Sequence, residues 1–148
     1  MTDRFSLAEY EQTIREVLES GGQFTLYPRG TSMLPLIVQE RDSVSLVRTQ
    51  ECRRGDIAFY KRADGSFILH RVIGAENGAL VMCGDNQLTP EYGVSHAQVI
   101  GTVERITRRG RTFGVRSPAY RLYCAVWRSF FVRRVYFRLR RLFNGGKK

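Results

Sequence analysis

Apolar residues at the start of the chain recur with the spacing of an amphipathic helix. The residues that share this face are Leu7, Tyr10, Ile14, Val17 and Leu18. Positions that recur three and four residues apart lie above one another on a helix. Two glycines at 21 and 22 follow and end the pattern. We therefore predict an N-terminal amphipathic helix over residues 1–22.

From Phe24 onward the pattern becomes that of β-strands. Short apolar runs flank three turn signals, Asp64-Gly65, Asn77-Gly78 and Arg109-Gly110. Asp-Gly and Asn-Gly tolerate positive φ and are strong hairpin signals. The predicted strands cover residues 57–60, 67–73, 79–82, 99–107 and 111–116. The pattern predicts a mainly β fold over residues 23–116, a compact, coiled and mostly antiparallel sheet assembly.

The last segment, residues 117–148, differs in kind because aromatic residues and arginines dominate it. Pro118 suits the first turn of a helix. One helical stripe would hold Val132, Val135, Tyr136, Leu139, Leu142 and Phe143, with arginines over the remainder. The segment is too short and too charged to span a bilayer comfortably. It predicts a basic C-terminal helix that is a candidate for lying in a membrane interface.

The charge of the chain is divided unequally between its two parts. The net charge is +10 over 148 residues. Residues 1–104 hold ten Lys and Arg against fourteen acids, whereas residues 105–148 hold fourteen Lys and Arg and no acid. Such a tail attracts phospholipid headgroups, nucleic acid or an acidic partner surface. A 148-residue chain of this composition predicts one domain with an appendage.

The cysteines and the N-terminus bear on the compartment. The three cysteines are odd in number and lack metal-ligand spacing, which favours free thiols in a reducing compartment. The N-terminus lacks the regions of a secretory signal. We expect a cytoplasmic protein that lies peripherally on a membrane surface. The sequence holds no metal cluster, phosphate loop or dinucleotide fingerprint, so no metal or cofactor is expected.

Three short runs supply the parts of a serine hydrolase. Gly30-Thr31-Ser32-Met33-Leu34-Pro35 presents a serine two residues after a glycine, His70 lies on an apolar strand, and Gly84-Asp85-Asn86 places an acid in a tight turn. A serine hydroxyl needs a base to take its proton, and the base needs an orienting group. The runs therefore predict a nucleophile, a base and an acid.

Together with residues 54–59, Arg-Gly-Asp-Ile-Ala-Phe, these runs make four pieces in a fixed order. Their order and flanking residues resemble the signal peptidase I and LexA-like serine peptidase superfamily, in its Ser-His branch. The resemblance covers roughly residues 24–106. It implies a fold of the LexA and signal peptidase type for the β segment.

The resemblance assigns roles to individual residues. Ser32 stands at the position of the nucleophile, and His70 stands where the Ser-Lys branch carries lysine. The acid is either Asp85 or Glu91, which lies six residues further on. If Glu91 is the acid, Asp85 would serve only to hold its loop. The oxyanion hole would use the backbone N–H of Ser32. Some members of the family supply a second donor from a serine at the position of Gly30, and Thr31 is the candidate for that role here.

The function expected from these assignments is that of a serine endopeptidase that cleaves a leader or signal-like peptide. The alternative is a non-catalytic module of the same fold that binds a membrane or a partner through its basic tail. A self-cleaving regulator bound to nucleic acid ranks last, because no DNA-binding domain precedes the peptidase region and no lysine base is present. We expect a peptide or protein substrate and an anionic membrane surface as partners, rather than nucleic acid.

Overall fold

The computed structural model describes residues 7–144. The parts of the expected N-terminal helix and C-terminal tail at residues 1–6 and 145–148 lie outside the described residues. The elements are α1 (Leu7–Glu19), β1 (Phe24–Leu26), β2 (Ser43–Val47), β3 (Ile57–Lys61), β4 (Phe67–Glu76), β5 (Ala79–Cys83), β6 (Glu91–Val94), a 3₁₀ turn (His96–Gln98), β7 (Val99–Arg108), β8 (Arg111–Gly114), α2 (Pro118–Trp127) and α3 (Phe130–Asn144).

The eight strands form one antiparallel sheet in the order β1-β2-β7-β3-β4-β5-β6, with β8 paired to β7. The prediction of a mainly β, antiparallel fold is therefore confirmed. Consecutive strands β3, β4 and β5 pair as hairpins, whereas β7 returns from far along the chain to lie between β2 and β3. This return joins β1 and β2 to strands β3–β6 in one sheet.

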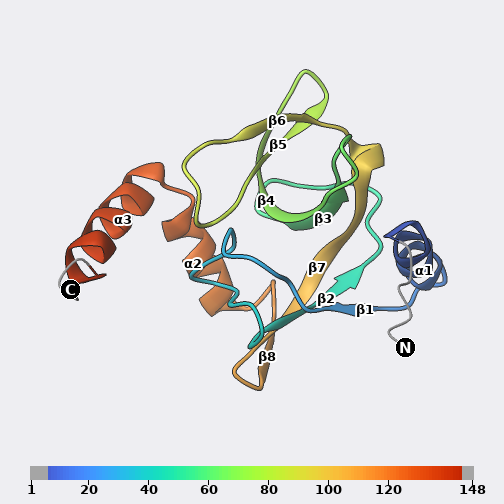
Figure 1. Ribbon diagram of the computed structural model, residues 1–148, viewed down its shortest axis with the longest axis horizontal. Coiled ribbons are helices and arrows are strands. Elements are labelled where there is room, and N and C mark those ends of the chain that lie inside the picture. Colours follow the sequence, from blue (N-terminus) through green and yellow to red (C-terminus); the bar gives the residue numbers. More distant parts are fainter. Residues whose placement is uncertain (1–6, 145–148) are drawn as a thin grey trace.

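The sheet is strongly curved, and Figure 1 shows β3–β6 in the upper part of the molecule, β1, β2 and β8 in the lower part, and the long strand β7 running between them. Its register shifts in four strand pairs, including those between Ser45 and Leu46 and between Phe59 and Tyr60. A shift of this kind adds a residue to one strand, which bends it and increases its twist. Local irregularities along the ladders thus account for the coiled shape.

The hairpin turns lie where their dipeptides predict them. Asn77 and Gly78 have φ values of 50° and 76°, and Arg109 and Gly110 have 50° and 77°. Two successive residues with positive φ give a turn whose twist matches that of the flanking strands. The β4–β5 and β7–β8 hairpins are therefore specified locally.

Helix α1 covers the half of the sheet that contains β1, β2 and β7. Ile14 and Leu18 are fully buried among core residues of these strands. The helix approaches β7 so closely that a Cβ on Gly101 would lie 2.7 Å from Leu18 Cδ1. The N-terminal amphipathic face is thus used for packing.

A second apolar cluster lies between β3, β4 and β5. Its members are Cys52, Ala58, Tyr60, Val72, Leu80, Met82 and Val94. Ile68 packs against it from β4. Because His70 lies between Ile68 and Val72 at strand spacing, its side chain shares their face.

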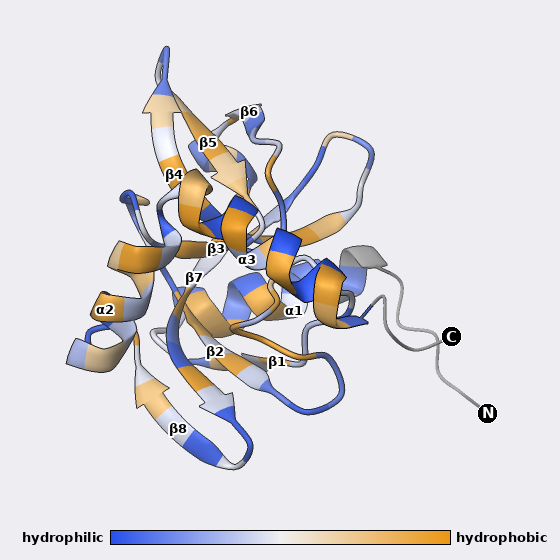
Figure 2. Cartoon of the chain, turned by 90° about the vertical axis from the view of Figure 1, so that its left-hand side faces the viewer, coloured by the Kyte–Doolittle hydropathy of each residue, from blue (hydrophilic) through white to orange (hydrophobic). Residues whose placement is uncertain are grey.

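Helices α2 and α3 lie together at one side of the molecule, away from α1 (Figure 1). Ser117 caps α2 by accepting a hydrogen bond from Tyr120 N at 3.4 Å, and Pro118 fills the first helical position. Figure 2 faces this side and shows apolar positions along both helices. Within residues 7–144, no helix is long and apolar enough to cross a bilayer.

Candidate active site

Ser32 lies in the connection between β1 and β2, where the chain makes tight turns. Gly30 has a φ of 88°, and its N–H donates to Gln39 Oε1 at 2.7 Å. Met33 is buried in the main core, which anchors the turn from below. Ser32 itself is half-buried, and neither its hydroxyl nor its N–H bonds a described residue. Both groups of Ser32 therefore lack a hydrogen-bond partner among the described residues.

The serine turn is pressed against the Gly84-Asp85-Asn86 turn. The Ser32 carbonyl accepts a hydrogen bond from Asn86 N at 2.8 Å. A Cβ on Gly84 would lie only 2.6 Å from the same carbonyl oxygen, so this position requires glycine. Two of the runs singled out in the sequence are thus in direct contact.

The same contact places Ser32 beside β4. Arg71 of β4 pairs with Cys83 of β5. In an antiparallel pair, one step further brings Gly84 beside His70. In addition, a hollow of about 70 Å³ is lined by Ser32 together with Phe67, Ile68 and Leu69 of β4. The serine turn therefore borders the segment of β4 that carries His70.

His70 is buried, with a relative exposure of 3%. Its Nδ1 lies 3.5 Å from the hydroxyl of Tyr60, and the two rings meet edge to face at 6.3 Å. No hydrogen bond joins His70 to Ser32 in the described structure. The other ring nitrogen, Nε2, has no partner among residues 7–144.

Among residues 7–144, the imidazole of His70 is thus engaged at Nδ1 and without a hydrogen-bond partner at Nε2. His70 does not itself line the hollow beside Ser32, which is bordered by the three residues that precede it on β4.

Tyr60 connects His70 to Glu91. The Tyr60 hydroxyl donates to Glu91 Oε2 at 2.7 Å, and Arg62 donates to both oxygens of the same carboxylate at 2.9 and 2.7 Å. Because the tyrosine gives its hydrogen to Glu91, it can only accept from His70, which requires the hydrogen on Nδ1. This assignment leaves the lone pair on Nε2.

The electrostatics of this chain of contacts favour a neutral imidazole. Burial, together with the positive charge of Arg62, lowers the pKa of His70 to about 4, although Glu91 and Asp85 oppose this shift. The hydrogen bonds from Arg62 hold the pKa of Glu91 below its usual value. At neutral pH the site therefore combines a neutral His70 with an ionised Glu91.

Asp85 is engaged elsewhere. Arg71 donates to both of its carboxylate oxygens, each at 2.8 Å, and the hydroxyl of Tyr123 donates at 2.9 Å. Its backbone carbonyl accepts from Trp127 Nε1 at 2.8 Å. Asp85 is fully buried and makes no hydrogen bond with His70. It fastens β4 and α2 to the turn that touches Ser32.

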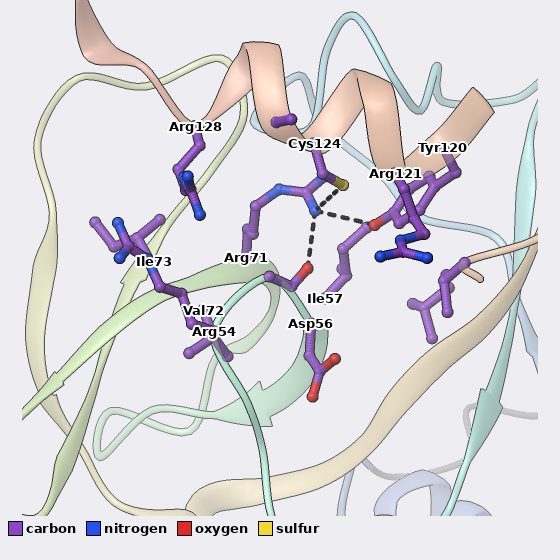
Figure 3. Close-up of a pocket in the computed structure, with 14 residues that line it drawn as sticks. Arg54, Asp56, Ile57, Arg71, Val72, Ile73, Tyr120, Arg121, Cys124 and Arg128 are labelled. Carbon is purple, nitrogen blue, oxygen red and sulfur yellow. Dashed lines mark hydrogen bonds between the residues drawn. The ribbon is translucent and has the colours of Figure 1, made fainter. Parts of the chain in front are cut away.

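A second hollow, of about 420 Å³, lies behind Arg71 (Figure 3). There the Arg71 Nη1 donates to Gly55 O at 2.9 Å, Tyr120 Oη at 2.9 Å and Cys124 Sγ at 3.2 Å. Neither Ser32 nor His70 lines this hollow. Arg71 thus belongs to the support of the site and separates this hollow from it.

Of the residues singled out in the sequence, the structure brings Ser32 next to the Asp85 turn and beside β4, and links His70 to Glu91. Thr31 is exposed at the start of the serine turn. Sequence reasoning missed Tyr60, which lies inside an apolar run and reads as a core residue. Side chains alternate along a strand, so Tyr60 lies on the same face as Ala58, and Ala58 pairs with His70 on β4. This alternation is the feature of the sequence that could have indicated Tyr60.

No protein-family model, curated protein or solved structure gives a match to this chain. The functional assignment therefore depends on the motif residues and on the geometry described above.

Proposed function

We propose that this protein is a serine endopeptidase in which Ser32 is the nucleophile and His70 the general base. The observation that carries the proposal is the meeting of two elements. A half-buried serine with unpartnered hydroxyl and N–H groups borders the strand that holds a buried histidine. That histidine has its Nδ1 side occupied by Tyr60, and its Nε2 has no hydrogen-bond partner among the described residues.

The reaction follows from these roles. Ser32 Oγ attacks the peptide carbonyl while His70 Nε2 takes its proton, and the same nitrogen then protonates the leaving amine. Water later cleaves the acyl-enzyme by the same route. The Ser32 N–H is free to donate to the developing oxyanion, and Thr31 remains the candidate second donor.

We infer that Glu91, acting through Tyr60, is the acid that orients His70. Both oxygens of Asp85 are occupied by Arg71, which supports the alternative role of holding the loop. Glu91 instead reaches the imidazole through one hydroxyl. A carboxylate in this position fixes the tautomer and stabilises the imidazolium that forms during the reaction.

The expected substrate is a leader or signal-like peptide with small residues before the scissile bond. The hollow beside Ser32 is small, with a volume of about 70 Å³, which is compatible with this choice. Its lining includes the apolar residues Met33, Ile37 and Leu69. We infer that the enzyme acts in the cytoplasm, and its three unpaired cysteines are compatible with a reducing compartment.

Cleavage of synthetic leader peptides by the purified full chain tests the proposal. Ser32→Ala should abolish cleavage, whereas Ser66→Ala, which changes a serine in another tight turn, should not. A serine-reactive fluorophosphonate should label Ser32 in the wild type and not in His70→Gln. Equal cleavage by wild type and Ser32→Ala, or no labelling of the folded wild type, would refute the proposal in favour of a non-catalytic module.

A further inference from the structure

The exposed apolar side chains of this protein are concentrated on α2 and α3. Seven of the ten large ones among the described residues belong to these two helices. They are Leu122, Val126, Phe131, Val135, Leu139, Leu142 and Phe143. Monomeric proteins rarely expose a contiguous set of this kind without a binding role.

On α3 these side chains form a stripe along the outer side. Phe131, Val135, Leu139 and Leu142 recur at four- and three-residue intervals, so they lie on one face. Phe131 and Leu142 are each 75% exposed. At about 1.5 Å per residue the stripe is roughly 17 Å long, which suits a helix that lies flat on a surface.

The opposite side of α3 is held by the domain. Arg133 is fully buried and donates to Trp127 O, Gly84 O and Gln87 O at 2.8, 3.0 and 3.1 Å. The Tyr136 ring packs on that of Trp127 with 5.0 Å between centroids. Because this inner face is fixed, the outer stripe points away from the domain without needing to unfold.

The charge around the stripe indicates which kind of partner this surface binds. Arg134, Arg138 and Arg141 flank it, Arg121 and Arg128 lie on α2, and residues 118–144 contain no acid. A second copy packed symmetrically on this face would bring arginines against arginines. Nucleic acid would pair with the arginines but leave the phenylalanine and leucine side chains against phosphates. An anionic bilayer accepts both, since acyl chains take the apolar stripe and headgroups take the arginines.

We propose that α2 and α3 form a docking surface for an anionic lipid bilayer, with α3 lying in the interface. The helices also hold the site: Trp127 bonds Asp85, Arg133 bonds Gly84, and Gly84 contacts Ser32. Docking would therefore hold the helices that support the serine turn at the bilayer, where a membrane-bound leader is present. This last step rests on the proposed peptidase function, whereas the docking itself does not.

Vesicle co-sedimentation with the full chain tests the docking. We expect binding to phosphatidylcholine vesicles that contain phosphatidylglycerol, weak binding to phosphatidylcholine alone, and loss of binding with added salt. The double variant Phe131→Ser/Leu142→Ser should bind about 100-fold more weakly, since each large apolar side chain contributes about tenfold. Arg134→Gln/Arg138→Gln should lose about fivefold per arginine, on the anionic vesicles only.

The matched control is Tyr27→Ser/Tyr92→Ser, which removes two side chains that are 70% and 62% exposed outside the helices and should not change binding. Equal binding to both vesicle types, no binding, or full binding by the Phe131/Leu142 variant would overturn the proposal. So would tighter binding to duplex DNA at the same salt, or a dimer that this variant dissociates while vesicles stay unbound. Ser32→Ala should bind as the wild type does, so a chain that binds vesicles but cleaves nothing refutes only the peptidase function.

Discussion

The clearest consequence of the structure concerns Asp85, whose removal should destabilise the fold. The Asp85 carboxylate is fully buried between two buried arginines. Arg71 donates to it twice at 2.8 Å, and Arg133 Nη2 lies 3.7 Å from Oδ1. In Asp85→Asn the amide keeps the shape of the side chain but loses its charge and turns an acceptor into a donor. Both guanidinium groups would then be left without a counter-charge.

Breaking a buried ion pair by removing one partner costs about 3–5 kcal/mol. A chain of this length loses about 2–4 °C in melting temperature per kcal/mol. We therefore expect Asp85→Asn to melt about 10–15 °C below the wild type. Asp64→Asn changes an acid in the exposed β3–β4 turn and serves as the control, with a much smaller shift.

Thermal unfolding followed by circular dichroism measures this effect, and a double-mutant cycle with Arg71→Met assigns it. Asp85→Asn/Arg71→Met should be less destabilised than the sum of its single variants, because it removes both members of the pair. A melting temperature within about 2 °C of the wild type for Asp85→Asn would show that the carboxylate does not compensate the buried arginines.

Three further predictions concern the site. Glu91→Gln and Tyr60→Phe should each lower kcat by about tenfold or more with little change in KM, since both disturb the orientation of the base rather than substrate binding; unchanged kcat in both would exclude this role. Because burial lowers the pKa of His70 to about 4, cleavage should rise with pH around 4 rather than 6.5. Between pH 4 and 6.5, His70 is protonated in the unfolded chain but not in the folded one. The free energy of unfolding should therefore fall by up to about 3 kcal/mol as the pH drops from 6.5 to 4. In denaturant titrations, His70→Gln should remove that loss. Gly84→Ala should cost about 1–3 kcal/mol and most of the activity, because its Cβ would lie 2.6 Å from the serine turn, whereas Gly74→Ala has open space and should be near neutral in both assays.

The local parts of the fold could be predicted from the sequence. The β3–β4, β4–β5 and β7–β8 hairpins lie where turn dipeptides lie, because residues with positive φ act within a few positions of themselves. The short strands β1 and β6 have no such signal. Each exists because a longer strand is present beside it, β2 for the first and β5 for the second. Their pairing depends on contacts that only the folded chain provides.

The two acids show why roles within the site could not be predicted completely. Asp85 and Glu91 are both acids in or beside turns, and the sequence left both open as the third catalytic residue. Their difference comes from the neighbours that folding supplies. Arg71 of β4 reaches Asp85 in the turn that follows β5, whereas Tyr60 and Arg62 bring Glu91 toward His70. These side chains are distant in sequence and carry no local sign of their partners.

Helix α3 shows a different limit. The sequence placed Tyr136 on the same stripe as Val135 and Leu139, and it placed the arginines, Arg133 among them, over the remainder of the helix. In the structure Tyr136 packs inward on Trp127, and Arg133 is the most deeply buried residue of the helix. An arginine is rarely buried unless it is paired. Here Asp85 and three backbone carbonyls provide that pairing, which rotates the apolar stripe toward the outside.

The low pKa of His70 follows from the different partners of Asp85 and Glu91. An ionised carboxylate in direct contact with His70 would favour the imidazolium and raise its pKa. Glu91 is instead one hydroxyl away and shares its charge with Arg62, while Asp85 is bound by Arg71. The histidine can therefore stay buried and neutral, and it gains compensation from Glu91 only while it holds the serine proton. The variant Arg62→Gln tests this arrangement. It should raise the pKa of His70, because it removes a nearby positive charge and leaves the Glu91 carboxylate without its arginine partner.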